Sequence, residues 1–563
     1  MTAVHAPKDA EKKRPAICIM RDKRIFGNPQ NDGTGIQYLY LNNGRLQHFA
    51  RINGNVEDEE TIEMLEHAGT FRKMVHSIGI TMTGEDLTHT GEFVLQMYGT
   101  DDPDVGGVTW KKTVIMNGVE QRIILAEEAG CEDEAITGQI RVILPEGETV
   151  ELTVVFYLND GFKAPEMPDT AKPVLEGEAY RKLIGKSLMS LGNPYRLQLF
   201  LEKARRGEPV TVAFIGGSIT QGAGAIPISR FCYAMRFYEK ICEYIGPENA
   251  KNVRFVKAGA GGTSSELGMI RYAKDVTNDG EIHPDLVVVE YAVNDNDDEL
   301  QGQSFDSLVR KIYNAPESPA VMLIFAVFAD DFNLQDRHRK VGEAYGLPMV
   351  SVKDAVVPQF YQKEERVISK SQYFYDVFHP SNAGHEIMAD GLMYALKAAD
   401  LAEKAKADTD ISGIEPPYSG EYENIVLIDR DHCPGDVEIH CGSFSDTDED
   451  LQKVERDKNP EGTPEFPANW CHRIGDEPFV MDLSCKALFI CNKDSGSGAF
   501  GKADVFVDGK LLKTIDPRKV GWTHCNAFFL FNEEKPARHH VEVRMAEGDR
   551  DKWNTILGFG AVL

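Results

Sequence analysis

The middle of the chain alternates short, wholly apolar runs with segments of helical length. The apolar runs are not interrupted by polar positions, which is typical of parallel strands buried on both faces. A long helical pattern near 178–206 precedes them. Strands are expected near 211–215, 252–256, 285–291, 320–328 and 348–352. This alternation predicts a flavodoxin-like three-layer α/β/α domain, which we place at 178–408.

The first 165 residues show another pattern, with short strand-like runs separated by Gly, Asn and Asp and with few helix signals. The runs are IQYLYL (36–41), EFVLQMY (92–98), WKKTVIM (110–116), QRIIL (121–125) and TVELTVVFYL (149–158). Such strands predict a β-sandwich-like domain over 1–165. A Pro-bearing linker at 161–177 would join it to the α/β domain.

Strand signals return after a second linker, marked by Pro416 and Pro417. Asp508-Gly509 is a hairpin signal inside ADVFVDGKLLKTI (503–515). Further strands are expected at 526–531, 539–545 and 555–563. We therefore predict a second β-sandwich-like domain over 418–563.

The most informative motif is TVAFIGGSITQG (211–222), in which an apolar strand leads through two glycines into a helix. Gly216 and Gly217 permit a tight turn that side chains would obstruct. The turn would hold Ser218 at the carboxyl end of a strand, where open α/β sheets bind their ligands. Taken alone, the motif could also be a Gly-rich turn in which Ser218 only caps a helix.

A second motif, DVFH (376–379), offers partners for that serine. A serine hydroxyl needs a base within hydrogen-bond reach, and His379 is a candidate because an unperturbed imidazole is a base near neutral pH. Asp376, three residues earlier, could orient the ring and stabilise the imidazolium. The pair would lie on one loop before a helix that begins near Ser381.

Two further segments complete a pattern: AGAGGTSS (258–265) and LVVVEYAVNDND (286–297). The order Ser, Gly, Asn and Asp-x-x-His resembles the SGNH hydrolases, a branch of the GDSL esterase/lipase superfamily. The resemblance covers about residues 185–400. It implies that Ser218 is the nucleophile, with Asp376 and His379 completing the triad. It also implies an oxyanion hole formed by the N–H groups of Ser218 and Gly262 and the amide of Asn294.

The resemblance has two departures. Ala292 stands where the family often has glycine in its third block, so one methyl group could narrow the pocket floor. The first block reads GGSIT rather than GDS, which is similar to the carbohydrate-esterase branches. Ala292 and Ile219 would both crowd the acyl side of the site if they point inward.

The composition of the chain limits the kinds of partner that it is expected to bind. Lys and Arg number 61 against 89 Asp and Glu, for a formal charge of −28, which disfavours nucleic acid and anionic membrane surfaces. No apolar run reaches the roughly 18 residues of a membrane span. The charged N-terminus, MTAVHAPKDAEKKRP, has no signal-peptide core, so a cytoplasmic location is expected.

Metal and cofactor sites are not expected. Six of the ten cysteines fall in the last third of the chain, several beside histidines, but no C-x-x-C pair occurs there and core packing is the favoured role. The acidic runs 294–299 and 446–450 lack the ligand spacing of calcium loops. His385 and Asp390 are interpreted as structural, and His338 as a helix-surface residue. GWTHCN (521–526) is the aromatic–polar cluster of most interest in the last domain.

The sequence thus predicts a serine esterase that removes small acyl groups, chiefly O-acetyl, from carbohydrates such as xylan or mannan oligosaccharides. Alternatives are a lipase or thioesterase for longer acyl chains, and a carbohydrate-binding protein with a relic hydrolase domain. No cofactor is expected, and the β-domains could support a homo-oligomer.

Overall fold

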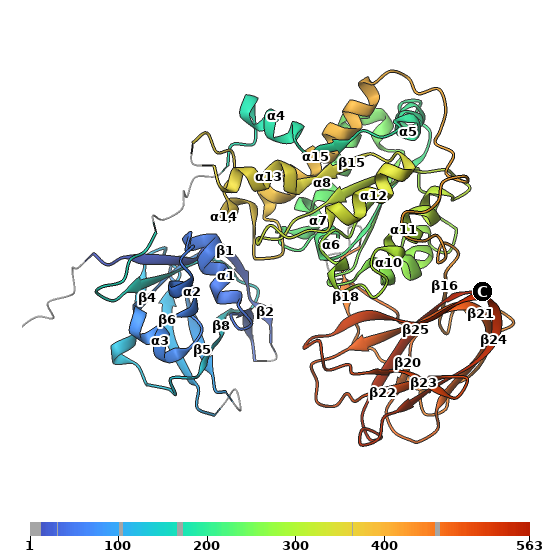
Figure 1. Cartoon of the computed structure of the whole chain (residues 1–563). Coiled ribbons are helices and arrows are strands. Elements are labelled where there is room, and N and C mark those ends of the chain that lie inside the picture. Colours follow the sequence, from blue (N-terminus) through green and yellow to red (C-terminus); the bar gives the residue numbers. More distant parts are fainter. Residues whose placement is uncertain (1–12, 31, 101–104, 166–172, 363, 457–461) are drawn as a thin grey trace, which may run out of the picture. The chain divides into compact units, whose positions relative to one another are not determined.

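The computed structural model describes residues 13–30, 32–100, 105–165, 173–362, 364–456 and 462–563. Its contacts divide the chain into two compact units (Figure 1). The first contains Met1–Pro173 and Ser369–Phe378, and the second contains Val174–Ile368 and His379–Leu563. The N-terminal charged segment and part of the predicted 161–177 linker lie outside the described residues.

The first unit contains two antiparallel sheets, with strand orders β1-β9-β4-β7 and β2-β3-β8-β5-β6. A single apolar core receives side chains from both sheets. The strands are β1 (Ala16–Phe26), β2 (Asn28–Pro29), β3 (Thr34–Tyr40), β4 (Val75–Gly84), β5 (Thr90–Tyr98), β6 (Val108–Ile115), β7 (Gln121–Ile124), β8 (Ile136–Pro145) and β9 (Thr149–Leu158).

Helices were expected to be scarce here, yet this unit contains α1 (Arg45–Gly54), α2 (Glu59–Glu63), α3 (Ala68–Met74) and α14 (Lys370–Tyr373). Helix α3 is fixed by packing rather than by a long sequence pattern. Its buried Phe71 stacks on Trp110 at a centroid distance of 6.3 Å and meets Phe156 edge-on at 5.1 Å. A helix of seven residues is too short to be stable alone, so its periodicity gave no signal.

The second unit begins with the hydrolase domain, a six-stranded sheet of order β10-β15-β14-β13-β11-β12. The five strands after β10 are parallel and β10 is antiparallel. The parallel order is the flavodoxin-like one, which confirms the predicted fold class. The strands are β10 (Leu188–Ser190), β11 (Val210–Gly216), β12 (Val253–Gly259), β13 (Leu286–Glu290), β14 (Ala320–Phe325) and β15 (Met349–Ser351).

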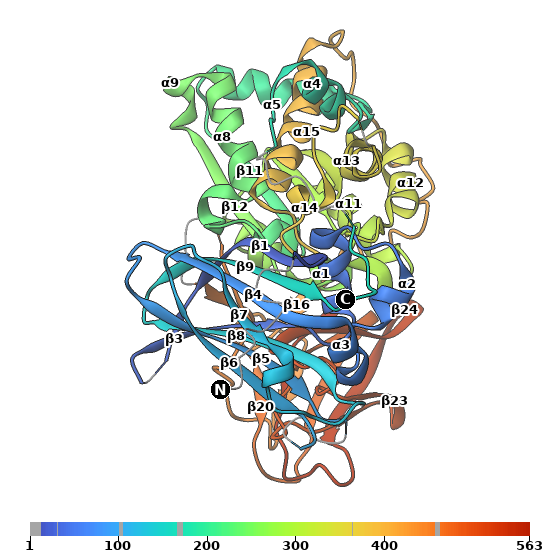
Figure 2. The same cartoon turned by 90° about the vertical axis from the view of Figure 1, so that its left-hand side faces the viewer.

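Helices cover both faces of this sheet (Figures 1 and 2). Helices α5, α8 and α15 pack together on one side, and α10, α11 and α12 form a chain of contacts on the other. The helices are α4 (Gly177–Gly185), α5 (Tyr195–Arg205), α6 (Ser218–Gln221), α7 (Ile228–Phe231), α8 (Tyr233–Ile245), α9 (Pro247–Ala250), α10 (Ser265–Tyr272), α11 (Gln303–Tyr313), α12 (Gln335–Tyr345), α13 (Val352–Phe360) and α15 (Asn382–Leu401).

The prediction of one long helix near 178–206 was wrong. The segment forms α4, strand β10 and α5, with a turn at 192–194 between the last two. Gly192 has φ +59°, and a Cβ there would lie 2.3 Å from Gly346 O, so only glycine fits. Asn193 Oδ1 then accepts the Tyr195 N–H at 3.1 Å, at the start of α5.

The rest of the second unit is a β-domain built on an eight-stranded sheet. The Asp508-Gly509 hairpin is present, and both residues have positive φ. The strands expected at 526–531 and 539–545 are parts of one long strand, β24. The strands are β16 (Val426–Ile428), β17 (Glu438–His440), β18 (Lys453–Val454), β19 (Thr463–Pro464), β20 (Trp470–His472), β21 (Phe479–Asp494), β22 (Ala503–Val507), β23 (Lys510–Ile515), β24 (His524–Met545) and β25 (Asn554–Val562).

The hydrolase domain and the β-domain share one apolar core. Ile270 of α10 belongs to the same buried cluster as Leu427, Phe489 and Leu557 of the β-domain. The backbone of β25 approaches so closely that a Cβ on Gly560 would lie 2.6 Å from Ile270. The β-domain is therefore docked on the hydrolase domain as part of its interior.

A buried ion network crosses the same contact. Arg271 and Asp275 pair at 2.9 Å, and Arg456 of the β-domain reaches Asp275 at 2.8 Å. Glu465, also of the β-domain, accepts from Lys274 at 3.1 Å. The three surrounding cations hold the pKa of the Asp275 carboxyl well below its usual range, against the effect of burial. The network pairs charges that would otherwise be costly to bury.

Within the described ranges, no helix has the length and apolar character needed to cross a bilayer.

Candidate active site

The candidate nucleophile lies on a turn that only glycines permit. Strand β11 ends at Gly216, and helix α6 starts at Ser218. A Cβ on Gly216 would lie 2.2 Å from Thr220 Oγ1, and one on Gly217 would lie 2.1 Å from Asn294 Oδ1. Since neither contact is possible, both positions require glycine. The turn places half-buried Ser218 at the carboxyl end of β11, between β12 and β13, where the strand order reverses.

His379 lies within hydrogen-bond distance of that serine. Its Nε2 is 2.9 Å from Ser218 Oγ. For the serine O–H to donate, Nε2 must be the unprotonated nitrogen, and the neutral ring then carries its proton on Nδ1. His379 lies just before α15, whose first turn is capped by Ser381 Oγ accepting the Gly384 N–H at 3.3 Å. The geometry suits removal of a proton from Ser218 by the imidazole.

The loop after β12 brings a backbone donor to the same place. Gly262 has φ +73°, the left-handed region that favours glycine. A Cβ on Gly261 would lie 3.8 Å from Ser218 Cβ, which shows how closely the loop approaches the nucleophile. Among the described residues, no backbone or side-chain acceptor takes the Gly262 N–H. This donor can therefore serve a substrate oxygen.

Asn294 follows β13, and its side chain packs against Gly217. Its Oδ1 is buried and has no hydrogen-bond partner in the described ranges. The next residue, Asp295, fixes the loop, because its carboxylate accepts the Ser265 N–H at 2.7 Å and the Ser265 hydroxyl at 2.8 Å. The loops after β12 and β13 are thus joined behind the site.

Asp376 is described within the first unit. Its Oδ1 accepts the Phe378 N–H at 2.8 Å. In the same unit, Lys23 Nζ lies 3.9 Å from the centroid of the Tyr375 ring. Burial lowers the pKa of Lys23 to about 8, and the Asp376 carboxylate opposes that shift. The role of Asp376 as the carboxylate that orients His379 stays a prediction.

Glu290, the last residue of β13, is an acid that sequence reasoning did not single out. It is fully buried and accepts from Thr220 Oγ1 at 3.3 Å, directly behind the nucleophile turn. Burial raises the pKa of its carboxyl to about 8, so near neutral pH it is largely protonated. Its position at the end of the apolar run LVVVE was the sequence feature that could have marked it as a buried acid.

The aromatic–polar cluster 521–526 of the β-domain reaches this site. A Cβ on Gly262 would lie 3.0 Å from Trp522 Cζ2 and 3.0 Å from His524 Nε2. The Trp522 and His524 rings are 4.7 Å apart, and the Trp522 side chain is 48% exposed. An exposed indole therefore stands beside the proposed oxyanion donor.

Two other histidines serve the fold. His385 is buried, accepts the Tyr233 N–H on Nδ1 at 3.1 Å and donates from Nε2 to Ala223 O at 3.0 Å. The prediction that His338 lies on a helix surface was wrong. It is fully buried and stacks on Phe305 at 3.8 Å, because the face of α12 that carries it packs against α11.

The cysteine–histidine alternative finds no geometric support. All ten cysteines are thiols. The described part of the chain holds no group of three or more Cys, His, Asp or Glu side chains placed to bind a metal ion.

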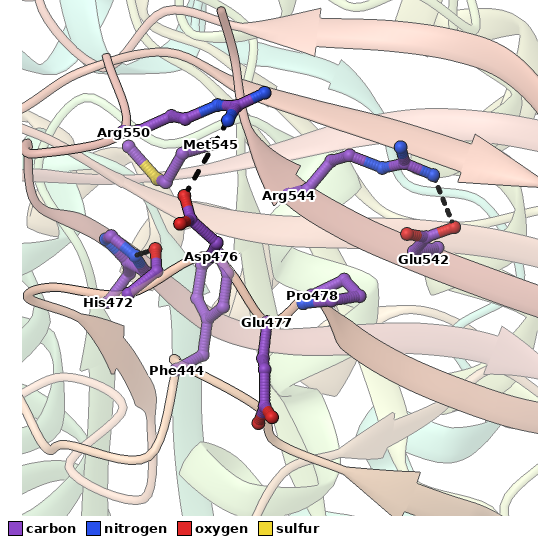
Figure 3. A pocket seen from close by; sticks show the side chains of 10 residues that line it. Phe444, His472, Asp476, Glu477, Pro478, Glu542, Arg544, Met545 and Arg550 are labelled. Atoms are coloured by element: carbon purple, nitrogen blue, oxygen red, sulfur yellow. Dashed lines mark hydrogen bonds and ion pairs between the residues drawn. The ribbon is translucent and has the colours of Figure 1, made fainter.

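The β-domain also contains a polar cavity of about 170 Å³ (Figure 3). Two ion pairs lie in its wall, Arg544 with Glu542 at 2.7 Å and Arg550 with Asp476 at 3.9 Å. His472 in its wall contacts two backbone carbonyls. This cavity has no nucleophile and is not the candidate active site.

Comparison with known proteins agrees with this geometry. Residues 214–387 match the GDSL-like Lipase/Acylhydrolase family. The chain carries an SGNH hydrolase domain accompanied by β-rich domains, and it is an esterase similar to the carbohydrate acetylesterases. A search of curated proteins gave no match.

Two solved structures are similar to about two thirds of the chain. A two-domain esterase (CEX) active on acetylated mannans has 25% identity and a TM-score of 0.57, with 68% of this chain and 99% of that chain covered. The same esterase co-crystallised with mannopentaose has 25% identity and a TM-score of 0.56, with 67% and 98% covered.

Proposed function

We propose that the protein removes O-acetyl groups from carbohydrates through a covalent acyl-enzyme on Ser218. The observation that carries the proposal is the 2.9 Å separation of Ser218 Oγ and His379 Nε2 at the carboxyl end of a parallel strand. His379 takes the serine proton as Oγ attacks the ester carbonyl, then returns it to the departing sugar hydroxyl. Water hydrolyses the acyl-enzyme by the same steps in reverse order.

Negative charge that develops on the carbonyl oxygen needs donors already in place. In this proposal the N–H groups of Ser218 and Gly262 and the Asn294 amide supply them. Asp376 would orient His379 and stabilise its imidazolium. The Gly262 N–H and the packing of Asn294 on Gly217 support this assignment.

Three features support a carbohydrate substrate. The similar two-domain esterase acts on acetylated mannans. The exposed Trp522 indole beside Gly262 offers an apolar face of the kind on which sugar rings pack. The formal charge of −28 suits a neutral oligosaccharide better than an anionic one.

The test combines labelling with product analysis. A fluorophosphonate should label the wild-type protein, and Ser218→Ala should abolish labelling and hydrolysis of 4-nitrophenyl acetate. Acetylated mannan and xylan oligosaccharides should lose units of 42 Da, the mass of one acetyl group less a proton, in mass spectra. Ser190→Ala, on the edge strand β10, is the matched control. Normal turnover by Ser218→Ala would overturn the proposal.

A further inference from the structure

Two side chains of the β-domain hold the peptide groups on both sides of the Gly262 Cα. Gln452 Nε2 donates to Gly261 O at 2.8 Å, and its Oε1 accepts the Cys525 N–H at 2.8 Å. His524 Nε2 lies 3.1 Å from Gly262 O. Gln452 and His524 are each 6% exposed, so these bonds are made away from bulk water.

The bond from Gln452 acts on the oxyanion donor directly. The carbonyl of Gly261 and the N–H of Gly262 belong to one planar peptide group. A donor on that carbonyl draws electrons toward the oxygen, which makes the N–H a stronger donor, as in chains of hydrogen bonds. The same bond fixes the plane of the peptide and hence the direction of the N–H.

His524 lies between two hydrogen-bond acceptors. Its Nδ1 faces Asp494 Oδ2 at 2.9 Å, and Asp494 is 1% exposed. A backbone carbonyl and a carboxylate are both hydrogen-bond acceptors, so each ring nitrogen of His524 faces an acceptor. The ring of His524 is therefore held between Asp494, at the end of β21, and the Gly262 carbonyl.

The β-domain that carries Gln452 and His524 is firmly attached to the hydrolase domain. The β-domain shares its apolar core with α10 and is joined to it by the Arg271–Asp275–Arg456 network. Gly262 presents the N–H from the left-handed region, at φ +73°, which glycine adopts without strain.

We propose that Gln452 and His524 are positioning residues of the oxyanion hole, through which the β-domain orients and strengthens the Gly262 donor. The proposal rests on the proposed function of Ser218 and Gly262. It gives the β-domain a part in acyl transfer itself, separate from any contact with sugar.

The test compares Gln452→Met with Gln198→Met. Gln198 is a buried match, because its Nε2 donates to Ala399 O at 2.9 Å and its Oε1 accepts the Ala405 N–H at 3.0 Å, both in the hydrolase domain. The two variants lose the same kinds of bond. Substrates are 4-nitrophenyl acetate and its thiono analogue, whose sulfur is a weaker hydrogen-bond acceptor than oxygen.

Gln452→Met should lower kcat by about tenfold or more while KM stays within a few-fold, a smaller loss than removal of a whole donor causes. The preference for the oxo over the thiono ester should also fall. Gln198→Met should change the melting temperature and leave the oxo/thiono ratio unaltered. An unaltered ratio in Gln452→Met, or an equal change in both variants, would overturn the proposal.

Variants of His524 test the proposal independently if Gln452→Met fails to fold. His524→Leu should reproduce the fall in kcat and in the oxo/thiono ratio, and His524→Gln, which can still donate toward Gly262 O, should recover part of both. His472→Leu is its control, since His472 contacts two carbonyls of the same β-domain away from the site. If His524→Leu keeps the wild-type ratio, the inference is wrong.

Ser218→Ala in the same assay distinguishes failure of the positioning role from failure of the proposed function. An inactive Ser218→Ala together with a Gln452→Met of wild-type behaviour refutes the positioning role alone. An active Ser218→Ala refutes the proposed function as well.

Discussion

Arg271 donates to the carbonyl oxygen of Gly216 at 2.9 Å, which ties a buried guanidinium to the last residue of the strand that carries the nucleophile. The same side chain donates to Ala258 O at 2.8 Å and pairs with Asp275. The ends of β11 and β12 are thus held by the Arg271 guanidinium. Its partner Asp275 also pairs with Arg456 of the β-domain. The Arg271 side chain therefore contacts both the strand that leads into the nucleophile turn and the strand that leads into the Gly262 loop.

Arg271→Met should strongly destabilise the protein. It would leave two buried carbonyls without this donor and remove one of the cations around buried Asp275, and breaking a buried pair typically costs about 3–5 kcal/mol. Denaturant unfolding measures the loss. Arg205→Met, whose guanidinium pairs with Asp400 at a partly exposed site, should cost no more than about 1 kcal/mol. Equal losses in the two variants would contradict a special role for Arg271.

Asn294→Ala should lower kcat by about 10²–10³ and leave KM within a few-fold, because the oxyanion exists mainly in the transition state. Steady-state kinetics on 4-nitrophenyl acetate test this. Asn314→Ala, at an exposed amide that donates to Glu423, is the control and should keep wild-type rates. A change in KM alone would reassign Asn294 to binding of the ground state.

His379→Ala should reduce turnover more than Asp376→Asn. Removal of the base leaves nothing to accept the Ser218 proton, whereas a misoriented imidazole retains some function. Pre-steady-state acylation rates give the comparison. Full activity in His379→Ala would remove the triad assignment, and an Asp376→Asn variant with unchanged kcat would remove Asp376 from it.

Glu290→Gln should flatten the pH dependence of stability. Burial raises the pKa of Glu290 from 4.5 in the unfolded chain to about 8, so the folded state binds more protons between these values. Its contribution to stability is therefore complete below pH 4.5 and declines as the pH rises toward 8, by at most about 1.4 kcal/mol per pH unit.

Melting temperatures of wild type and Glu290→Gln between pH 5 and 8.5 measure this effect. The wild type should lose stability with rising pH more steeply than the variant. Glu248→Gln, at an exposed helix end, should follow the wild-type curve. Parallel curves for wild type and Glu290→Gln would show that Glu290 keeps an ordinary pKa in the folded state.

Short acyl groups should be preferred. Ile219 and Ala292, the neighbours of the nucleophile turn and of Asn294, have no exposed surface, so a longer acyl chain directed at them would have to displace packed side chains. Overpacking costs about 1–3 kcal/mol, whereas an open slot would gain roughly 0.8 kcal/mol per methylene. We expect kcat/KM to fall at least about tenfold from acetyl to octanoyl 4-nitrophenyl esters. A rising series would favour a lipase or thioesterase.

The five parallel strands of the hydrolase sheet were predictable because residues buried on both faces form uninterrupted apolar runs, as β11 and β13 do. Motifs marked Ser218, Gly262, Asn294 and His379 as candidates, since each follows a strand or precedes a helix. The turn at Gly192 was missed because a helical pattern on both sides concealed it. Helix α3 was missed because tertiary packing of Phe71 stabilises it.

The supporting residues of the site could not be predicted. Gln452 is 191 positions from Gly261, and nothing near it in sequence marks it as a partner of a glycine loop. Arg271 reads as an ordinary helix residue until its carbonyl partners are known. The burial of His338 could not be predicted either. A polar side chain in a charged helix predicts exposure, and only the contact with Phe305 in the folded protein shows that it is buried.

The shared core between α10 and β25 has a consequence for ancestry. Genes exchange domains most readily at boundaries that few contacts cross. Here Ile270 is buried against Gly560, and a hydrolase domain released from its β-domain would present that apolar surface to water. We therefore expect substitutions on one side of the contact to require compensation on the other, which favours inheritance of the two domains together.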